Sequence, residues 1–339
     1  MDIDSCDKMS IDPAQKNRIL WLDMANVLAM VCVVWFHIPS QLEMPIRGWE
    51  YICVNIPFFL LSGYSYAIGR KQDETIKSHL LTTLRTLYLP TIIFFTCFYL
   101  LWIAIGKTLG GGEEQLYEPL LQLATGSFTT VLATFWFVFC LITIRLVFFV
   151  LGKLFRQKTV LYLICCLLPT ITLFVDIPNY YELRQALLFI PFFVLGYSLF
   201  LCSKQQYLPC LITLMGIVIY FVTDSIGGLN TNAYEWYEVA SGLLLSVAII
   251  LLSRAHKMRD GEIKLVNFLR GGSLLLLATQ NYIIGIVRVL LDKLTSTPDY
   301  LSAHIALKPF VLLLVYVITL PVIFLITRYA PFALGRRRE

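Results

Sequence analysis

Charged side chains are scarce in this chain, and their scarcity excludes a large soluble domain. Only 14% of the 339 residues are Asp, Glu, Lys or Arg, whereas an average soluble domain has about a quarter. Hydrophobic residues make up 58% of the chain, and its mean hydropathy is +0.73. The apolar residues fall in long blocks between short charged clusters. This pattern predicts an all-α polytopic membrane protein.

Several motifs of soluble chemistry are also missing. The sequence contains no P-loop, no Gly-x-Gly-x-x-Gly, no Gly-x-Ser-x-Gly and no cluster with metal-ligand spacing. The nine cysteines include no Cys-x-x-Cys pair, so we interpret them as small hydrophobic residues. We therefore expect no metal site and no bound cofactor. We also expect no nucleic-acid partner, because membrane orientation explains the basic residues.

Ten apolar segments are long enough to cross the hydrocarbon layer of a bilayer, which takes about twenty helical residues. The predicted spans are residues 19–39, 51–69, 87–106, 131–151, 159–176, 185–202, 207–223, 236–253, 272–291 and 305–327. The inner loop 254–271 is long enough for a short interfacial helix. We expect three parts: a tail over 1–17, a transmembrane domain over 18–331 and a basic tail over 332–339.

Lysine and arginine lie unevenly on the two sides of these spans. With the N-terminus inside, 20 of them fall in inner segments and 5 in outer ones. Cytoplasmic segments of membrane proteins are enriched in Lys and Arg. We therefore expect a multi-pass protein of the cell (inner/cytoplasmic) membrane, with both termini in the cytoplasm. Residues 1–17 contain four aspartates instead of a basic region, so we expect no cleavable signal peptide.

Three polar residues, Asp23, Asn26 and His37, interrupt the first apolar segment. In an α-helix Asn26 and His37 would lie about 20° apart around the axis and ~16 Å apart along it, with Asp23 near the same stripe. Ionisable groups in a membrane usually face the bundle interior or a water-filled cavity. The stripe predicts a polar passage with His37 at its outer end, placed to take and return a proton. The alternative is an interfacial His37 and an Asp23 that caps the helix.

Five short stretches follow one another at the predicted membrane boundaries: "RILWLD" with "VVWFH", then "NIPFFLLSGYSY", "LRTLYLP", "TFWFV" and "IPFFVLGYSLF". In this order they resemble the acyltransferase 3 family of integral membrane O-acyltransferases, and most of all its fucose 4-O-acetylase-like branch. The resemblance covers residues 18 to about 330.

The resemblance implies an enzyme that takes an acyl group, usually acetyl from cytoplasmic acetyl-CoA. The group goes to a hydroxyl of an extracytoplasmic or lipid-linked glycan. The family's catalytic first-span histidine corresponds to His37, and its arginine before the third span corresponds to Arg85. An arginine there would hold a CoA phosphate through bidentate hydrogen bonds. Ordinary flanking of a span by a positive residue explains Arg85 equally.

Two positions depart from the family pattern. Asn26 stands where the family often has Arg or Lys, eleven residues before the histidine. Gln280 stands where the family commonly has His, seven residues after Ser273. The chain therefore either uses a variant arrangement for the acyl donor or is a slow or degenerate member.

The remaining candidates divide between the two halves of the bundle. We expect the inward-opening, donor-binding half to be lined by Asp23, Asn26, Ser62, Tyr64 and Gln280. Arg288, toward the outer end of the ninth span, is a candidate for binding an anionic acceptor, and it also fits pairing with an outer carboxylate or snorkelling.

An outer carboxylate would orient His37 as in a His–carboxylate pair. The candidates are Glu43, Glu50, Asp176, Glu182, Asp224, Glu235 and Glu238. Arg145 fits snorkelling toward the inner boundary. We assign no role to His79, His256 or His304.

The sequence thus predicts a membrane O-acyltransferase that uses acyl-CoA as co-substrate and a glycan as acceptor. His37 would act as general base on the acceptor hydroxyl, or relay the acyl group itself. A transporter or flippase for lipid-linked glycans would use the same polar stripe, but we find no paired broken spans of the kind such proteins have. A non-catalytic relative of the family is the other alternative, and Asn26 and Gln280 favour it.

Overall fold

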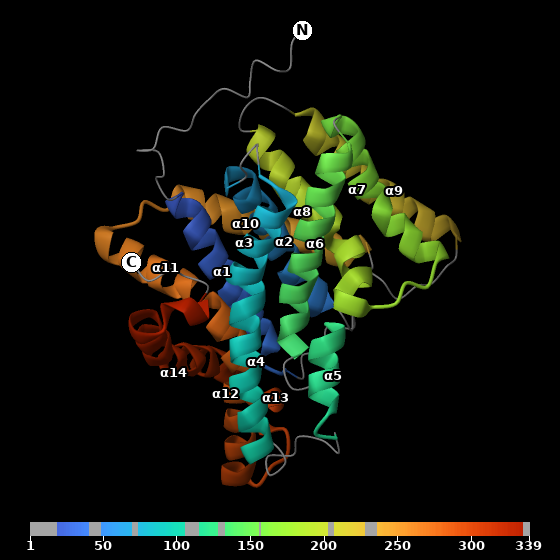
Figure 1. The fold of residues 1–339 in the computed structure, drawn as a ribbon. Helices are drawn as coiled ribbons and strands as arrows, with labels where there is room; N and C mark the ends of the chain where they lie inside the picture. Colours follow the sequence, from blue (N-terminus) through green and yellow to red (C-terminus); the bar gives the residue numbers. More distant parts are fainter. Residues whose placement is uncertain are drawn as a thin grey trace.

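The computed structural model describes residues 19–40, 49–69, 74–105, 115–127, 133–155, 157–202, 207–227 and 236–334. Every regular element among these residues is helical, as Figure 1 shows. Helices are the expected solution, because a backbone surrounded by lipid must satisfy its hydrogen bonds within its own segment.

Each of the ten predicted spans corresponds to one helix, which confirms the polytopic helical fold. Seven stretches are long and apolar enough to cross a membrane, and three shorter apolar helices accompany them. In chain order the ten helices are α1 (Leu20–His37), α2 (Trp49–Gly69), α4 (Leu89–Ile105), α6 (Trp136–Leu154), α7 (Lys158–Phe174), α8 (Leu183–Cys202), α9 (Leu208–Gly227), α10 (Trp236–Ala255), α12 (Ser273–Thr295) and α14 (Lys308–Tyr329).

The third span begins earlier than predicted. Helix α3 (Ile76–Thr83) runs through a π-helical turn, Leu84–Tyr88, directly into α4. Pro90 has no N–H, and its ring crowds the carbonyl group four residues before it. The Leu89 N–H bonds to the carbonyl of Leu84, five residues back, which is the wider π pattern.

Three short helices lie between the spans. Helix α11 (Asp260–Gly271) is the helix predicted in loop 254–271. Its start is capped by Glu262, whose carboxylate accepts the Arg259 N–H at 2.8 Å, and this bond lowers the pKa of that carboxyl. Helices α5 (Glu118–Thr125) and α13 (Tyr300–Ala303) were not predicted.

Helices α2 and α8 form the centre of the bundle, and two glycines allow their close approach. A Cβ atom on Gly63 would overlap the backbone carbonyl of Phe193, and one on Gly196 would overlap that of Leu60. Small residues at such crossings let membrane helices pack backbone to backbone. The close neighbour of Gly63 is therefore the α8 backbone.

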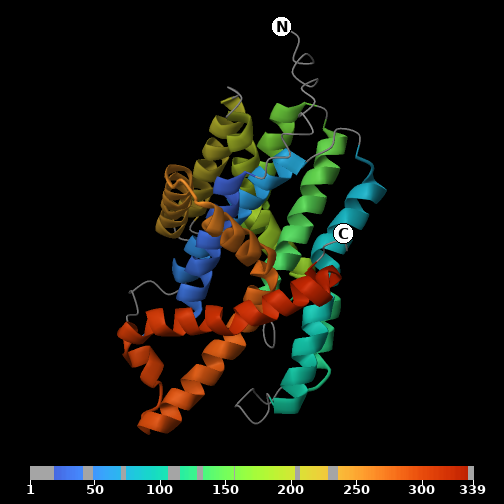
Figure 2. The same cartoon turned by 90° about the vertical axis from the view of Figure 1, so that its left-hand side faces the viewer.

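Helix α14 lies differently from the rest. In Figure 2 it runs across the view, whereas α6 stands upright. Only 22% of the residues in the most apolar stretch of its span are buried, compared with 72% for the span that contains α8. Helix α14 therefore covers the bundle from outside and crosses α1 and α12, which it contacts.

Candidate active site

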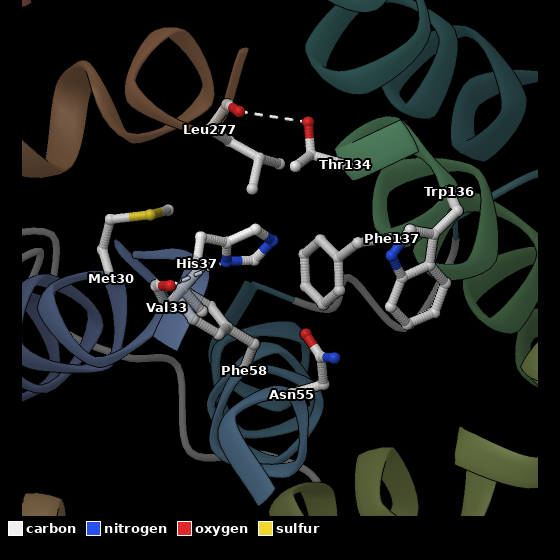
Figure 3. A pocket seen from close by; sticks show the side chains of 9 residues that line it. All are labelled: Met30, Val33, His37, Asn55, Phe58, Thr134, Trp136, Phe137 and Leu277. Carbon is white, nitrogen blue, oxygen red and sulfur yellow. Dashed lines mark hydrogen bonds between the residues drawn. The ribbon is translucent and has the colours of Figure 1, made fainter. Parts of the chain in front are cut away.

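A small cavity lies beside His37, at the end of α1. Its volume is about 30 Å³, enough for about two water molecules by this measure. The lining side chains come from four parts of the chain and are drawn in Figure 3: Met30, Val33, His37, Asn55, Phe58, Thr134, Trp136, Phe137 and Leu277. The stretches that carry the family resemblance in the first, second and fourth spans thus meet at one point.

The His37 ring has a defined protonation pattern. Its Nδ1 lies 2.7 Å from the carbonyl oxygen of Val33. A carbonyl oxygen only accepts hydrogen bonds, so Nδ1 carries the proton and donates it to Val33. The neutral ring then has its free lone pair on Nε2. In Figure 3 the ring projects into the cavity, beside Phe137, so Nε2 is available as a base.

Two neutral polar groups join His37 at the cavity. Asn55 of α2 is 8% exposed, and its amide points toward the same space in Figure 3. The hydroxyl of buried Thr134 donates to the carbonyl of Leu277 at 3.1 Å. The site therefore offers a base and an amide donor in apolar surroundings, which suits proton transfer at a hydroxyl group.

The other two residues of the polar stripe lie outside the cavity lining. Asp23 is buried and pairs with Arg270 of α11, with 2.9 Å between Oδ1 and Nη1. The amide of Asn26 donates to the carbonyl of Leu22 in its own helix at 2.7 Å. Along α1 the lining reaches from His37 to Met30, a length of ~10 Å. Asp23 and Asn26 are therefore held by protein groups.

A comparison with protein families identifies the chain. A family model described as an acyltransferase domain, acyltransferase 3, matches residues 19–328. The chain belongs to the acyltransferase 3 family. It is therefore a multi-pass membrane acyltransferase that acts on an acyl donor and an acceptor. Searches of curated proteins and of solved structures gave no match.

At the opposite end of α2, the acyltransferase has a cluster that includes Tyr64. The Tyr64 ring packs edge-on against Trp21, with 5.2 Å between centroids. The guanidinium of Arg254 lies over the Trp21 ring, 4.4 Å from its centroid. Ser62 lies on α2 between this cluster and the cavity. The structure thus groups Tyr64 with the Asp23–Arg270 end of α1, and not with His37.

Gln280 is a buried amide on α12. It is 0% exposed, and neither amide atom has a hydrogen-bond partner among the described residues. It lies one turn along α12 from Leu277, which lines the cavity. Buried amides without partners are rare, and each calls for an explanation such as a bound ligand, a water molecule or a catalytic role.

The two predicted arginines lie away from the cavity. Arg85 is in the π-helical turn and is exposed. Arg288 is about half exposed and pairs with Asp299. Pairing with a carboxylate was one of the alternatives that the sequence left open for Arg288.

The orienting group of His37 is the Val33 carbonyl, and not a carboxylate, as far as the structure describes the chain. Among the proposed carboxylates, Asp176 is exposed and Glu182 accepts from Asn179 at 2.7 Å, while Glu238 is buried. Glu43 and Glu235, and the side chains of Glu50 and Asp224, lie outside the described residues. Nor do three His, Cys, Asp or Glu side chains gather anywhere in the described part to hold a metal ion.

Sequence reasoning missed Asn55, Thr134 and the cavity aromatics. All of them lie inside the quoted stretches "NIPFFLLSGYSY" and "TFWFV". Asn55 had a usable signal, because it is an amide within an apolar span at about the depth predicted for His37. Thr134 had none, since threonine is common in membrane helices and normally bonds within its own helix.

Proposed function

We propose that this acyltransferase moves an acetyl group from cytoplasmic acetyl-CoA to a hydroxyl of an extracytoplasmic or lipid-linked glycan, like the fucose 4-O-acetylase branch. The observation that carries the proposal is His37, whose Nδ1–H is held by Val33 so that Nε2 faces the cavity. The excess of Lys and Arg on one side supports placing the His37 end outside and both tails, 1–17 and 332–339, in the cytoplasm of a cell-membrane protein.

The proposed reaction needs one base and one oxyanion donor. His37 Nε2 takes the proton of the acceptor hydroxyl, whose oxygen attacks the thioester carbonyl carbon. The Asn55 amide donates a hydrogen bond to the oxyanion that forms. The tetrahedral intermediate then collapses, the C–S bond breaks, and the departing thiolate takes the proton from the imidazolium. The products are the ester and free CoA, with His37 neutral again.

The donor reaches His37 from the other end of α1 in this proposal. We assign Ser62 and Tyr64 to the lining of that path, with Asp23 and Asn26 beside it, where Arg270 and the Leu22 carbonyl hold them. Gln280 has both amide atoms unused by the described protein, which suits hydrogen bonding to the donor's own amides.

The two arginines have outlying roles. We assign Arg85, exposed at the end that we place in the cytoplasm, to a CoA phosphate. We assign Arg288 to an anionic group of the acceptor, for which the pair with Asp299 would open.

Acetylation of the cell-surface polysaccharide tests the proposal. A deletion strain complemented with the wild type should regain the acetyl mass increment, and His37→Gln should not. Loss of a general base typically costs about 10²–10⁴-fold in rate. His304→Gln is a matched control, because exposed His304 also bonds through Nδ1 to a carbonyl four residues earlier, that of Tyr300, at 2.9 Å. Normal acetylation by a well-expressed His37→Gln variant would contradict the proposal.

Two further measurements separate the alternatives. Purified protein mixed with labelled acetyl-CoA but no acceptor should remain unlabelled if His37 is a base, and should become labelled if His37 relays the acyl group. If the deletion strain instead loses export of the glycan itself, with no change in acetyl content, a transporter replaces the transferase. An absence of acetyl-CoA binding would favour a non-catalytic relative.

A further inference from the structure

His79 attaches α3 to the rest of the bundle. It is 5% exposed, although most residues of α3 are exposed. Its ring stacks on Phe149 of α6, with 4.1 Å between centroids and 3° between planes. The ring also meets Tyr66 of α2 edge-on at 5.8 Å. Three elements therefore converge on this imidazole, which is part of neither the cavity nor the proposed donor lining.

The hydrogen bonding of His79 is half complete. Its Nδ1 lies 3.3 Å from the carboxylate of Glu74. Its Nε2 is buried and has no partner among the described residues. With Glu74 on Nδ1 and an anion on Nε2, the ring would be held as imidazolium and would donate an N–H to each. Leaving such a buried group unpaired costs free energy, so a ligand that accepts this bond would be favoured.

Two cationic side chains lie beside Phe149, the ring on which His79 stacks. Arg145 is one turn from Phe149 on the same face of α6, and its Nε is likewise buried without a partner among the described residues. The ammonium group of Lys153 is 5.6 Å from the centroid of Phe149. Positive groups thus flank the Phe149 ring, and Glu74 is the carboxylate that pairs with His79. The cluster suits an anion with several acceptor oxygens.

We propose that His79, Arg145 and Lys153 form a binding site for a phosphate group that enters between α3 and α6. Tyr66, which contacts His79, is eleven residues from Asn55 along α2. Along a helix this spacing corresponds to ~16 Å. This separation is comparable with the extended pantetheine arm of CoA. A nucleotide phosphate held at His79 would therefore let the thioester reach His37. The assignment to CoA rests on the proposed function; a phospholipid headgroup offers the same phosphate chemistry without it.

The test uses the full-length protein in nanodiscs with two phosphate probes. CoA and 3′-dephospho-CoA are titrated calorimetrically, and retention of phosphatidylglycerol against phosphatidylcholine is measured by native mass spectrometry. His79→Phe keeps the stack on Phe149 but removes Nε2, and Arg145→Gln removes the guanidinium. Lys158→Gln, an exposed lysine at the start of α7, is the control. Thermal melting checks the fold, and Arg145→Gln decides if His79→Phe does not fold.

The expected result is an affinity at least about tenfold weaker in both variants, the cost of one charge-assisted hydrogen bond, with the control within about twofold. If CoA binding falls, the phosphate is that of the donor, and wild-type dephospho-CoA shows whether the 3′-phosphate is the group bound. If only phosphatidylglycerol retention falls, the phosphate is that of a lipid. Unchanged binding of both probes overturns the site. A wild type that binds CoA without turnover would count against the transferase and not against this site.

Discussion

The two ends of α2 present opposite chemistry. At the His37 end, none of the nine side chains that line the cavity carries a fixed charge. A buried cation at this end, Lys308, lies 5.6 Å from the ring of Trp35, and Trp35 and His37 point about 160° apart around α1. At the other end are the His79–Glu74 and Asp23–Arg270 pairs and the Arg254–Trp21 contact.

This contrast matches what the proposed transfer from acetyl-CoA would demand. A small pocket without charged groups strengthens each hydrogen bond to a developing oxyanion, and a cation beside His37 would oppose its conversion to imidazolium. A multiply charged phosphate needs cations and would be excluded from such a pocket. Because the neutral pocket and the cations lie at opposite ends of α2, one donor molecule could place its thioester in the pocket and its phosphates beside the cations.

Removing the amide at the His37 end should have the largest effect. Asn55→Leu keeps the approximate size of the side chain but deletes the donor, and we expect kcat to fall about 10²-fold or more. The KM for acetyl-CoA should change little, because the bond forms only in the transition state. Asn281→Leu, an exposed asparagine of α12, is the control. A change in KM alone would move Asn55 from the reaction to ground-state binding.

Gln280 should give effects of opposite sign on stability and activity. Gln280→Leu replaces a buried amide without partners by an apolar side chain, which should raise stability by about 1–2 kcal/mol and increase the melting temperature. If the amide binds the donor, the same variant should raise the KM for acetyl-CoA. A variant that is both less stable and fully active would show that the amide is satisfied within the protein.

The fold could be predicted because hydrophobic length alone determines a span, and all ten spans were found. The limits of the third span could not, since Pro90 leads to a π turn instead of a break and lets α3 join α4. The crossing of α14 was equally hidden: its composition is that of any span, and only packing against α1 and α12 sets its direction.

The site was predictable only where one residue type has few roles. His37 was chosen as a candidate because an imidazole inside a span usually has a functional role. His79 was overlooked because it stands in a polar stretch, where burial depends on the neighbouring α6. Asp23 was expected on the donor side, and its pairing with Arg270, 247 residues away in the sequence, was not predicted. Pairings over such separations leave no local pattern.

Breaking the Asp23–Arg270 pair should have the smallest effect on activity. It tests whether this ion pair only stabilises the fold or also takes part in donor binding. Arg270 is 46% exposed at its side chain, so it keeps its hydration when Asp23→Asn removes the charge. We expect a loss of about 1 kcal/mol in stability, and a double-mutant cycle with Arg270→Gln should show that most of this loss belongs to the pair. Activity at saturating acetyl-CoA should remain within about twofold of the wild type, because the pair lies outside the cavity lining. A large rise in the KM for acetyl-CoA in Asp23→Asn, but not in Arg270→Gln, would instead place Asp23 against the donor. It would also show that the ion pair opens when the donor binds.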